Sequence, residues 1–448
     1  MDIREFPVLT DEDQRLVDRL STGLGEDAAR VLAYLLGRLE ADAFDRTATL
    51  TAIHIGTGLS RTATRECLRR LERTAVIDRT TVETATPGRP PTAWHAVAPR
   101  EETIRRVDNW HATRLLQQGL RFDEPGDEGP VPTDGQADGD RETRGDERRS
   151  NPTSKADPAG DRITVGLNWR PNGFHLPLFA AETDGSAAET PIDFRTYAGS
   201  SAAARAVAES DVDVGVAGAA TVLYERARGL AIVPVAVLLQ RSTVVLYTTR
   251  EAFGEPFEGI EQLRGRRLGT PHATETALLG RLLLEQADVG DAVEVVELDG
   301  EERDALRAGT VDVVTGMVPD ARRLARDGHS VDVVSLADQY PAYGQTLITT
   351  REAVQRDRDR SRLERFLAAT TAGWATATRA PAAADAAVSA IAARSNESPE
   401  RVVRTFRLAS ERFGSSDAVR KRGWGWHTPD DWHALRAALA QGGVLAVE

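Results

Sequence analysis

The alternation of apolar and polar residues divides the chain into three segments. Residues 1–122 carry apolar residues at helical spacing, with arginine and glutamate between them. Residues 123–162 contain only Val131 among the large apolar residues. Residues 163–448 alternate short valine-rich runs with longer runs rich in alanine, leucine and arginine. Because such alternation is typical of βαβ units, we expect this last segment to be an α/β domain with a mostly parallel sheet.

In the first segment, residues 51–77 predict a helix, a tight turn and a second helix. Gly58 accepts the left-handed backbone that ends a helix, and Ser60 is a good N-cap for the helix that follows. One face of that second helix is apolar and is expected to be buried; it carries Thr64, Leu68 and Leu71.

The opposite face of the second helix presents arginines. An α-helix fits the major groove of DNA, and arginine bonds guanine edges or phosphates. Two strands are expected at 76–84 and 93–97, with a stiff Pro-Gly-Arg-Pro-Pro turn at 87–91 between them. The candidate DNA-binding residues are Ser60, Arg61, Thr62, Arg65, Arg69 and Arg89.

This order of helix, turn, second helix and hairpin resembles the winged helix-turn-helix regulators over about residues 27–99. The run from Leu59 to Glu72 opens leucine-serine-arginine and later gives leucine-x-x-leucine-glutamate, as the recognition helix of that family does. The resemblance implies binding to double-stranded DNA. Two alternatives stay open: a helical domain whose arginines only face solvent, and a winged helix that binds a protein.

A further helix is expected over residues 101–120, with apolar residues along its length. In regulators of this kind such a helix often forms a homodimer, which would match a palindromic operator. The alternative is that it packs on its own domain.

Charge changes the picture in two ways. The chain has a net charge of −13, so any contact with DNA must come from a local basic patch. Residues 60–89 supply one, with seven arginines and four acids. The only lysines are Lys155 and Lys421. Arginine in place of lysine with an excess of acids fits a salt-adapted, halophile source, although a GC-rich genome alone gives the same preference.

Residues 123–162 hold twelve acids and six bases. Such a segment cannot bury enough surface to offset its ordering entropy, so we expect a disordered acidic linker between two domains, 1–122 and 163–448. The start of the chain does not resemble a signal peptide, and no apolar run is long enough to span a membrane, so we expect a cytoplasmic protein. A single cysteine, Cys67, excludes a multi-cysteine metal site.

The ligand site is expected where the strands of the C-terminal domain end, because open α/β sheets bind ligands beyond the carboxyl ends of their strands. Trp169 follows a strand at 163–167 and offers a flat surface for an aromatic ring. Each candidate also has an ordinary structural explanation, such as core packing for Trp169 or helix capping for His175. The candidate ligand-binding residues are Asn168, Trp169, Asn172, His175, Gly218, Ala219, Thr221, Gln240, Thr270, His272, Glu275, Tyr340 and Tyr343.

Residues 163–414 resemble the periplasmic-binding-protein-like family that includes thiamine-pyrimidine precursor binding proteins, the yeast-type pyrimidine synthase and the alkanesulfonate- and nitrate-type binding proteins. The leucine-asparagine-tryptophan…proline-asparagine…histidine run at 167–178 favours the pyrimidine branch. The resemblance implies a type II fold of two lobes joined by crossing strands, near 246–249 and 345–349, with ligand held between them. After Ala181 the chain departs from the family pattern, which puts the contacts near that point in doubt.

Three functions follow. A ligand-responsive transcription regulator without a cofactor fits the combination best, and its ligand would be a flat heteroaromatic such as a thiamine-precursor pyrimidine, or else a sulfonate or other small anion. An enzyme would need, as the resemblance implies, a lysine Schiff base and a cysteine cluster, whereas this domain has only Lys421 and no cysteine. A transport-type binding protein would need export.

Trp424 and Trp426 are expected to be packing residues.

Overall fold

The computed structural model describes residues 8–40, 46–82, 90–122, 162–183, 191–272, 274–298, 300–379 and 384–445. The predicted linker at 123–162, apart from Arg162, and the candidate Arg89 lie outside these described residues. In the described part of the chain no helix is long and apolar enough to cross a membrane.

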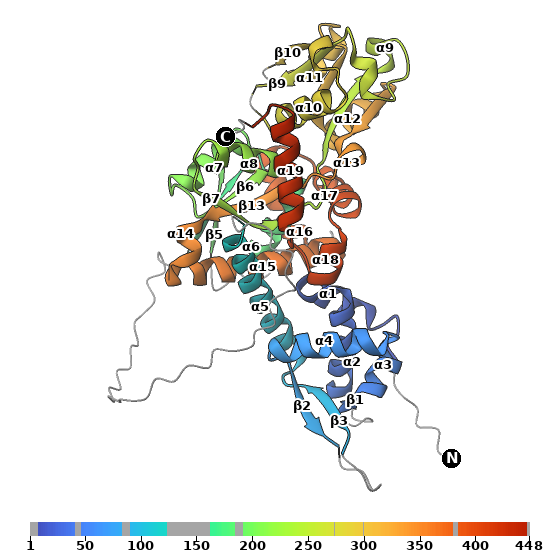
Figure 1. Ribbon diagram of the computed structural model, residues 1–448, viewed down its shortest axis with the longest axis vertical. Coiled ribbons are helices and arrows are strands. Elements are labelled where there is room, and N and C mark those ends of the chain that lie inside the picture. Colours follow the sequence, from blue (N-terminus) through green and yellow to red (C-terminus); the bar gives the residue numbers. More distant parts are fainter. Residues whose placement is uncertain are drawn as a thin grey trace.

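Residues 8–122 form an N-terminal unit of helices with a small antiparallel sheet (Figure 1). The strand order is β1-β3-β2, with both neighbours of β3 antiparallel to it. The elements are α1 (Gln14–Leu24), α2 (Glu26–Glu40), β1 (Ala48–Thr49), α3 (Leu50–Thr57), α4 (Arg61–Arg73), β2 (Ile77–Thr81), β3 (Thr92–Ala96) and α5 (Arg100–Leu120).

The turn between α3 and α4 has the expected construction. Gly58 adopts the left-handed conformation, and its N–H bonds to the carbonyl of His54. The Ser60 side chain accepts a hydrogen bond from Ala63 N, which satisfies one of the free donors at the start of α4. The apolar face of α4 is buried as predicted, through Thr64, Cys67, Leu68 and Leu71.

The C-terminal part contains two five-stranded sheets, and each defines one of the two lobes that the resemblance implied. In each sheet a single strand, β13 or β8, runs antiparallel to its neighbours, so both sheets are mostly parallel. The first lobe has the order β5-β4-β6-β13-β7, with β4 (Ile163–Leu167), β5 (Ile192–Thr196), β6 (Val214–Gly218), β7 (Ile232–Val237) and β13 (Gln345–Thr350). The second has β10-β9-β11-β8-β12, with β8 (Val244–Thr249), β9 (Arg267–Pro271), β10 (Glu294–Leu298), β11 (Val313–Met317) and β12 (Val331–Ser335).

Helices cover both sheets, and the last helix runs beside both lobes (Figure 1). Apolar side chains of this helix, α19, lie in one cluster with residues of both lobes. The α-helices of this part are α6 (Leu176–Thr183), α7 (Ser200–Ala208), α8 (Ala219–Ala227), α9 (Arg250–Phe253), α10 (Glu275–Gln286), α11 (Glu302–Arg307), α12 (Val318–Arg326), α13 (Leu336–Gln339), α14 (Arg351–Gln355), α15 (Asp357–Arg379), α16 (Asp385–Ser395), α17 (Pro399–Phe413), α18 (Asp417–Arg422) and α19 (Pro429–Gln441). Short 3-10 helices are η1 (Gly173–His175), η3 (Ile260–Leu263) and η4 (Gly290–Ala292).

The two lobes are joined by paired crossing segments at 238–243 and 340–344. Gly344 N bonds to Leu239 O at 2.9 Å, and Ser242 N bonds to Ala342 O at 2.7 Å, so the segments lie side by side. The predicted crossing strands, near 246–249 and 345–349, were misplaced by a few residues, because β8 and β13 each belong wholly to one sheet. The apolar runs in the sequence predict these two strands, but they do not predict the sheet to which each strand belongs.

Helix α5 connects the N-terminal unit to the first lobe. Val107, near its start, is buried in the core of the N-terminal unit. Farther along, Ala112, Leu115 and Leu116 are buried in the main core of the C-terminal part. At Gly119 an added Cβ would lie 2.8 Å from Pro234 O of β7, so the helix lies directly against the sheet. The apolar face expected to form a dimer or to pack on its own domain is thus shared between two domains of one chain.

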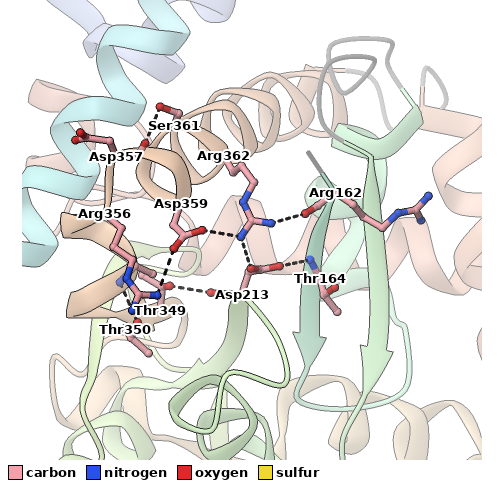
Figure 2. Close-up of polar contacts among 11 residues, drawn as sticks. Arg162, Thr164, Asp213, Thr349, Thr350, Arg356, Asp357, Asp359, Ser361 and Arg362 are labelled. Atoms are coloured by element: carbon pink, nitrogen blue, oxygen red, sulfur yellow. Dashed lines mark hydrogen bonds and ion pairs between the residues drawn. The ribbon is translucent and has the colours of Figure 1, made fainter. Parts of the chain in front are cut away.

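Hydrogen bonds and an ion pair around Arg362 hold α15, the helix against which α5 packs, to the first lobe. Figure 2 shows Arg362 of α15 reaching toward the start of β6, where it bonds to Asp213 Oδ1 at 2.7 Å. Arg362 also donates to the carbonyl of Arg162 at 2.8 Å. The other oxygen of Asp213 accepts from Thr164 N of β4 at 2.7 Å. These contacts therefore attach the starts of two strands, β4 and β6, to helix α15.

We predict that Arg362→Ala lowers the free energy of unfolding by about 1–3 kcal/mol, because it leaves the shielded Asp213 carboxylate without its charged partner. Urea unfolding followed by circular dichroism measures this. Arg162→Ala is the matched control: its side chain forms only an exposed pair with Asp193, which is worth about 0–1 kcal/mol. Equal losses in the two variants would contradict the assignment.

Candidate functional site

A set of buried polar side chains lies where β4 and β6 end in the first lobe. Together with Glu275 of the second lobe we call them the polar cluster. Ser200, at the start of α7, accepts a hydrogen bond from Gly218 N at 3.1 Å and from Asn168 Nδ2 at 3.2 Å. Asn168 Oδ1 lies 3.2 Å from His175 Nε2. The structure thus brings together three of the candidate residues, Asn168, His175 and Gly218, through Ser200, a serine that sequence reasoning missed.

Glu275 crosses from the second lobe to the first. Its carboxylate, at the start of α10, accepts hydrogen bonds from Ala220 N at 3.1 Å, Thr221 N at 2.8 Å and Thr221 Oγ1 at 2.6 Å. The N–H groups at the start of a helix favour a negative charge. Gly218 makes room for this approach, since a Cβ there would lie 2.1 Å from the Glu275 Cδ.

The Glu275 carboxyl is fully buried and has no cationic partner among the described residues. Burial raises its pKa above the usual value, and the three hydrogen bonds offset only part of that effect. Glu275, a ligand-binding candidate in the sequence, therefore forms a buried link between the two lobes.

His175 and Asn172 form a local cap. Asn172 Oδ1 accepts from Phe174 N, and Asn172 N donates to His175 Nδ1. Burial lowers the pKa of His175 to about 3, so the ring is neutral at ordinary pH. Both residues therefore cap η1, as the alternative for His175 suggested, and His175 also contacts Asn168.

Trp169 is the most accessible aromatic candidate. It follows β4 directly, and 58% of its surface is exposed. It is therefore not a core residue, although the sequence left that possible. A large apolar side chain exposed beside a buried polar cluster is a surface on which a flat ring can stack.

The candidates on the second lobe are divided. Thr270, at the end of β9, is buried and accepts a hydrogen bond from Thr315 Oγ1 of β11 at 2.9 Å. His272 is exposed and lies 2.9 Å from Glu297 Oε1 in a pair open to solvent. Ala219 lies at the start of α8, where its N–H bonds to Gly344 O in a crossing segment.

Three further candidate residues form hydrogen bonds with the C-terminal segment. Tyr340 donates to Ala434 O, and the hydroxyl of Tyr343 donates to Asp431 Oδ2. Gln240 donates to Trp426 O at 3.0 Å and accepts from Ser416 Oγ at 2.8 Å. They hold the C-terminal segment against the crossing segments at 238–243 and 340–344, and we call these two segments the hinge. A threonine-proline-aspartate-aspartate run at 428–431, which begins α19 with an N-cap and a proline, is the sequence signal that would have placed it.

The face of α4 opposite its buried side is open. Arg61, Thr62, Arg65 and Arg69 are exposed, and no ion pair or hydrogen bond to the described residues involves the three arginines. Cys67, on the buried side, has a pKa raised to about 12 by burial, so its thiol is unreactive. In the part of the chain that the structure describes, no cluster of histidine, cysteine or acidic residues is suited to hold a metal ion.

An interdomain seam separates the N-terminal unit from the first lobe. Trp424 lies buried in it: its backbone N–H bonds to Thr22 O at 2.7 Å, and its backbone carbonyl lies 2.6 Å from His111 Nε2 of α5. Burial lowers the pKa of His111 to about 4. A cavity of about 320 Å³ also lies in this seam and is lined by α1, α15 and α17–α18. Trp424 is therefore a packing residue, but one that joins two domains.

Two lobes, paired crossing segments and a polar cluster that spans the lobes define a hinged two-lobed α/β domain. Residues 172–384 match the model of the NMT1/THI5-like family.

Among curated proteins the chain is similar to the 4-amino-5-hydroxymethyl-2-methylpyrimidine phosphate synthases THI5 and THI12 of Saccharomyces cerevisiae. Each is 32% identical over 112 residues, which cover 24% of this chain and 32% of the relative. The chain thus spans about a third of the length of the curated relatives that it matches.

Among solved structures, the alkanesulfonate-binding protein of Xanthomonas axonopodis pv. citri, bound to MOPS, aligns with a TM-score of 0.48 and 15% identity, covering 64% of this chain and 95% of that one. A Candida albicans protein with the generic periplasmic-binding-protein fold aligns with a TM-score of 0.47 and 16% identity, covering 64% and 92%.

We predict that Glu275 makes the stability of the two-lobed domain depend on pH. Because burial raises its pKa, its stabilising contribution is fully present below the usual value of 4.5 and is lost as the pH rises through the raised value. Glu275→Gln stays uncharged at every pH. Unfolding by urea from pH 4.5 toward neutrality should therefore show that the wild-type chain loses stability relative to Glu275→Gln. Parallel pH profiles would show that the buried carboxyl does not titrate in this range.

Proposed function

We propose that the chain is a cytoplasmic, ligand-responsive DNA-binding transcription regulator. The observation that carries this proposal is α5, one helix whose two halves are buried in the cores of two different domains. A change in the first lobe therefore acts directly on the unit that bears α4. Coupling does not depend on the predicted linker.

The N-terminal unit would act as a winged helix-turn-helix that binds double-stranded DNA. Its α3–turn–α4 arrangement presents Arg61, Arg65 and Arg69 from the recognition helix, and β2 and β3 would form the wing. A helix with arginines on one exposed face suits the major groove. The local basic charge lets an acidic chain approach phosphates, although the molar salt of a halophile cytosol would weaken this attraction.

The ligand would be a small molecule, and a thiamine-precursor pyrimidine fits the polar cluster best. Its ring would stack on Trp169, and its amino group would donate to Glu275, a buried carboxylate without a cationic partner among the described residues. A sulfonate would instead need the helix terminus that Glu275 already occupies. Similarity of this domain to pyrimidine phosphate synthases supports the same ligand class.

The signal would pass from the hinge to α4 over a short path. Gln240, in a crossing segment, bonds to the carbonyl of Trp426. The ring of Trp426 lies against Arg114 of α5, 4.9 Å from its guanidinium carbon. A coupling free energy of about 1–3 kcal/mol would change operator affinity by 5–150-fold.

A homodimer on a palindromic operator remains part of the proposal. Since the apolar face of α5 is buried within one chain, the dimer would have to use another surface.

Catalysis by a lysine Schiff base finds no support in the geometry. Lys421 lies exposed at the end of α18, where its carbonyl accepts a hydrogen bond from Arg70. It belongs to the interdomain seam and not to the polar cluster between the lobes.

We predict that Arg65→Ala weakens binding to operator DNA by about 1–3 kcal/mol, because it removes an exposed guanidinium from the recognition helix. Fluorescence anisotropy with an operator selected from random duplexes measures the change. Arg15→Ala, which removes an equally exposed arginine from α1, should leave the affinity unchanged. If no duplex is selected, or if both variants bind alike, the DNA-binding proposal is wrong.

We predict that Trp169→Ala weakens binding of hydroxymethylpyrimidine by about fivefold or more, since stacking on an aromatic ring is worth about 1–3 kcal/mol. Trp169→Phe should keep most of the affinity. Calorimetry on the full chain, with taurine as the competing ligand class, gives the measurement. Binding of taurine alone would replace the pyrimidine by a sulfonate, and equal affinity of the wild type and Trp169→Ala would remove the stacking surface.

The same samples test regulation. Saturating the chain with the ligand that calorimetry identifies should change the anisotropy midpoint for the operator by at least fivefold. Identical midpoints with and without ligand would leave a DNA-binding protein and a ligand-binding protein in one chain, with no regulation between them.

A further inference from the structure

Five side chains from three distant parts of the sequence alternate in a stack at the interdomain seam. They are Arg70 of α4, Trp110 and Arg114 of α5, Trp426, and Arg422 of α18. The guanidinium carbons of Arg70 and Arg114 lie 5.3 and 5.0 Å from the Trp110 ring centroid. Those of Arg114 and Arg422 lie 4.9 and 5.9 Å from the Trp426 ring. Each guanidinium thus faces an aromatic ring, an attractive contact for a cation. We call this group the arginine–tryptophan stack.

Within the stack, Arg70 has a structural task. Its Nη1 donates to Lys421 O at 2.7 Å, and its Nη2 donates to Arg422 O at 3.4 Å. Arg70 therefore ties the end of α18 to α4. The side chains of Arg114 and Arg422 make no hydrogen bond or ion pair to the described residues besides these ring contacts, and both residues are only half-buried. Their donors remain available to an outside partner.

The stack is positively charged without compensation by the described residues. Burial lowers the pKa of Arg70 to about 10, and the positive charges of the neighbouring Arg114 and Arg422 contribute to the same decrease. The pKa of Arg114 is lowered to about 10 by burial, followed by Arg422, Arg73 and Arg121. No carboxylate is among the groups that shift either pKa. In a chain of net charge −13, a concentration of arginines that repel one another at a domain junction calls for an anion.

We propose that the arginine–tryptophan stack is a phosphate-binding site, in which Arg114 and Arg422 bond the phosphate oxygens and Arg70 positions Arg422. Guanidinium groups bond phosphate oxygens in pairs, and the two rings hold the flat groups in place. The phosphate comes either from the backbone of DNA or from a phosphate ester free in solution. The first source is suggested by Arg73, which is exposed at the end of α4 and close enough to lower the pKa of both Arg70 and Arg114. The inference stands whether or not the exposed face of α4 binds DNA.

The first arm of the test uses inorganic pyrophosphate and the full chain. Calorimetry and tryptophan fluorescence should both detect binding, because Trp110 and Trp426 lie in the stack. In Arg114→Gln/Arg422→Gln the affinity should fall by about tenfold or more. The matched control is Arg326→Gln/Arg404→Gln, which removes two exposed arginines that also repel one another. It should bind pyrophosphate as the wild type does.

The second arm identifies the source of the phosphate. If the stack binds a DNA phosphate, the Gln pair should show a slope of log affinity against log salt that is smaller by about 0.9 for each phosphate it no longer neutralises. Unchanged DNA binding together with abolished pyrophosphate binding assigns the site to a free phosphate ester. A folding control, Arg114→Lys/Arg422→Lys, keeps both charges and should keep the wild-type Tm and bind pyrophosphate more tightly than the Gln pair. If the Gln pair matches the Arg326→Gln/Arg404→Gln control in both arms, the stack is not a phosphate site.

Discussion

The burial of α5 in two cores is the constraint on which the arrangement of this chain depends. A helix with one apolar face ordinarily serves one domain, but here Val107 is buried with the N-terminal helices and Leu115 and Leu116 are buried with the sheet of the first lobe. The glycine at 119 lets the helix approach the backbone of β7. Backbone contacts of Trp424 with Thr22 and His111 close the same seam from the other side. Because the joint is made of buried apolar and polar contacts, the two domains hold a defined orientation.

The hinge and the seam share residues, and this links the two parts of the proposed mechanism. The crossing segment at 238–243 continues β7, against which α5 packs. Gln240 bonds to both Ser416 and Trp426, at the two ends of the segment that contacts the N-terminal unit. Helix α19 then returns along both lobes, where its apolar face joins their common cluster. The crossing segment and α4 are thus both bonded to residues 416–426, through Gln240 on one side and Arg70 on the other.

The sequence predicted local features well and long-range partnerships poorly. The turn at Gly58, the cap at Ser60 and the buried face of α4 follow from periodicity and capping, which act within a few residues. The α/β class follows from alternating strands and helices. Glu275 shows the limit: its spacing places it at the start of a helix, but nothing local indicates that the opposite lobe supplies its hydrogen-bond donors. The same holds for Gln240, Tyr340 and Tyr343, whose partners lie more than eighty residues away in the C-terminal segment. For the apolar face of α5 the sequence left open a dimer contact or packing on its own domain, and neither alternative included a lobe of the same chain covering that face.

The buried seam gives the covalent connection between the domains a minor role. In most two-domain proteins the linker sets how far apart the domains can move. Here the last helix before residue 123 is already buried in the domain that begins after residue 162. The two halves thus relate to one another as the subunits of a permanent heterodimer do, with chain continuity fixing mainly their stoichiometry and their effective concentration. We therefore expect two separate polypeptides with these surfaces to assemble into the same arrangement, with a gene fusion changing the kinetics of assembly more than the architecture.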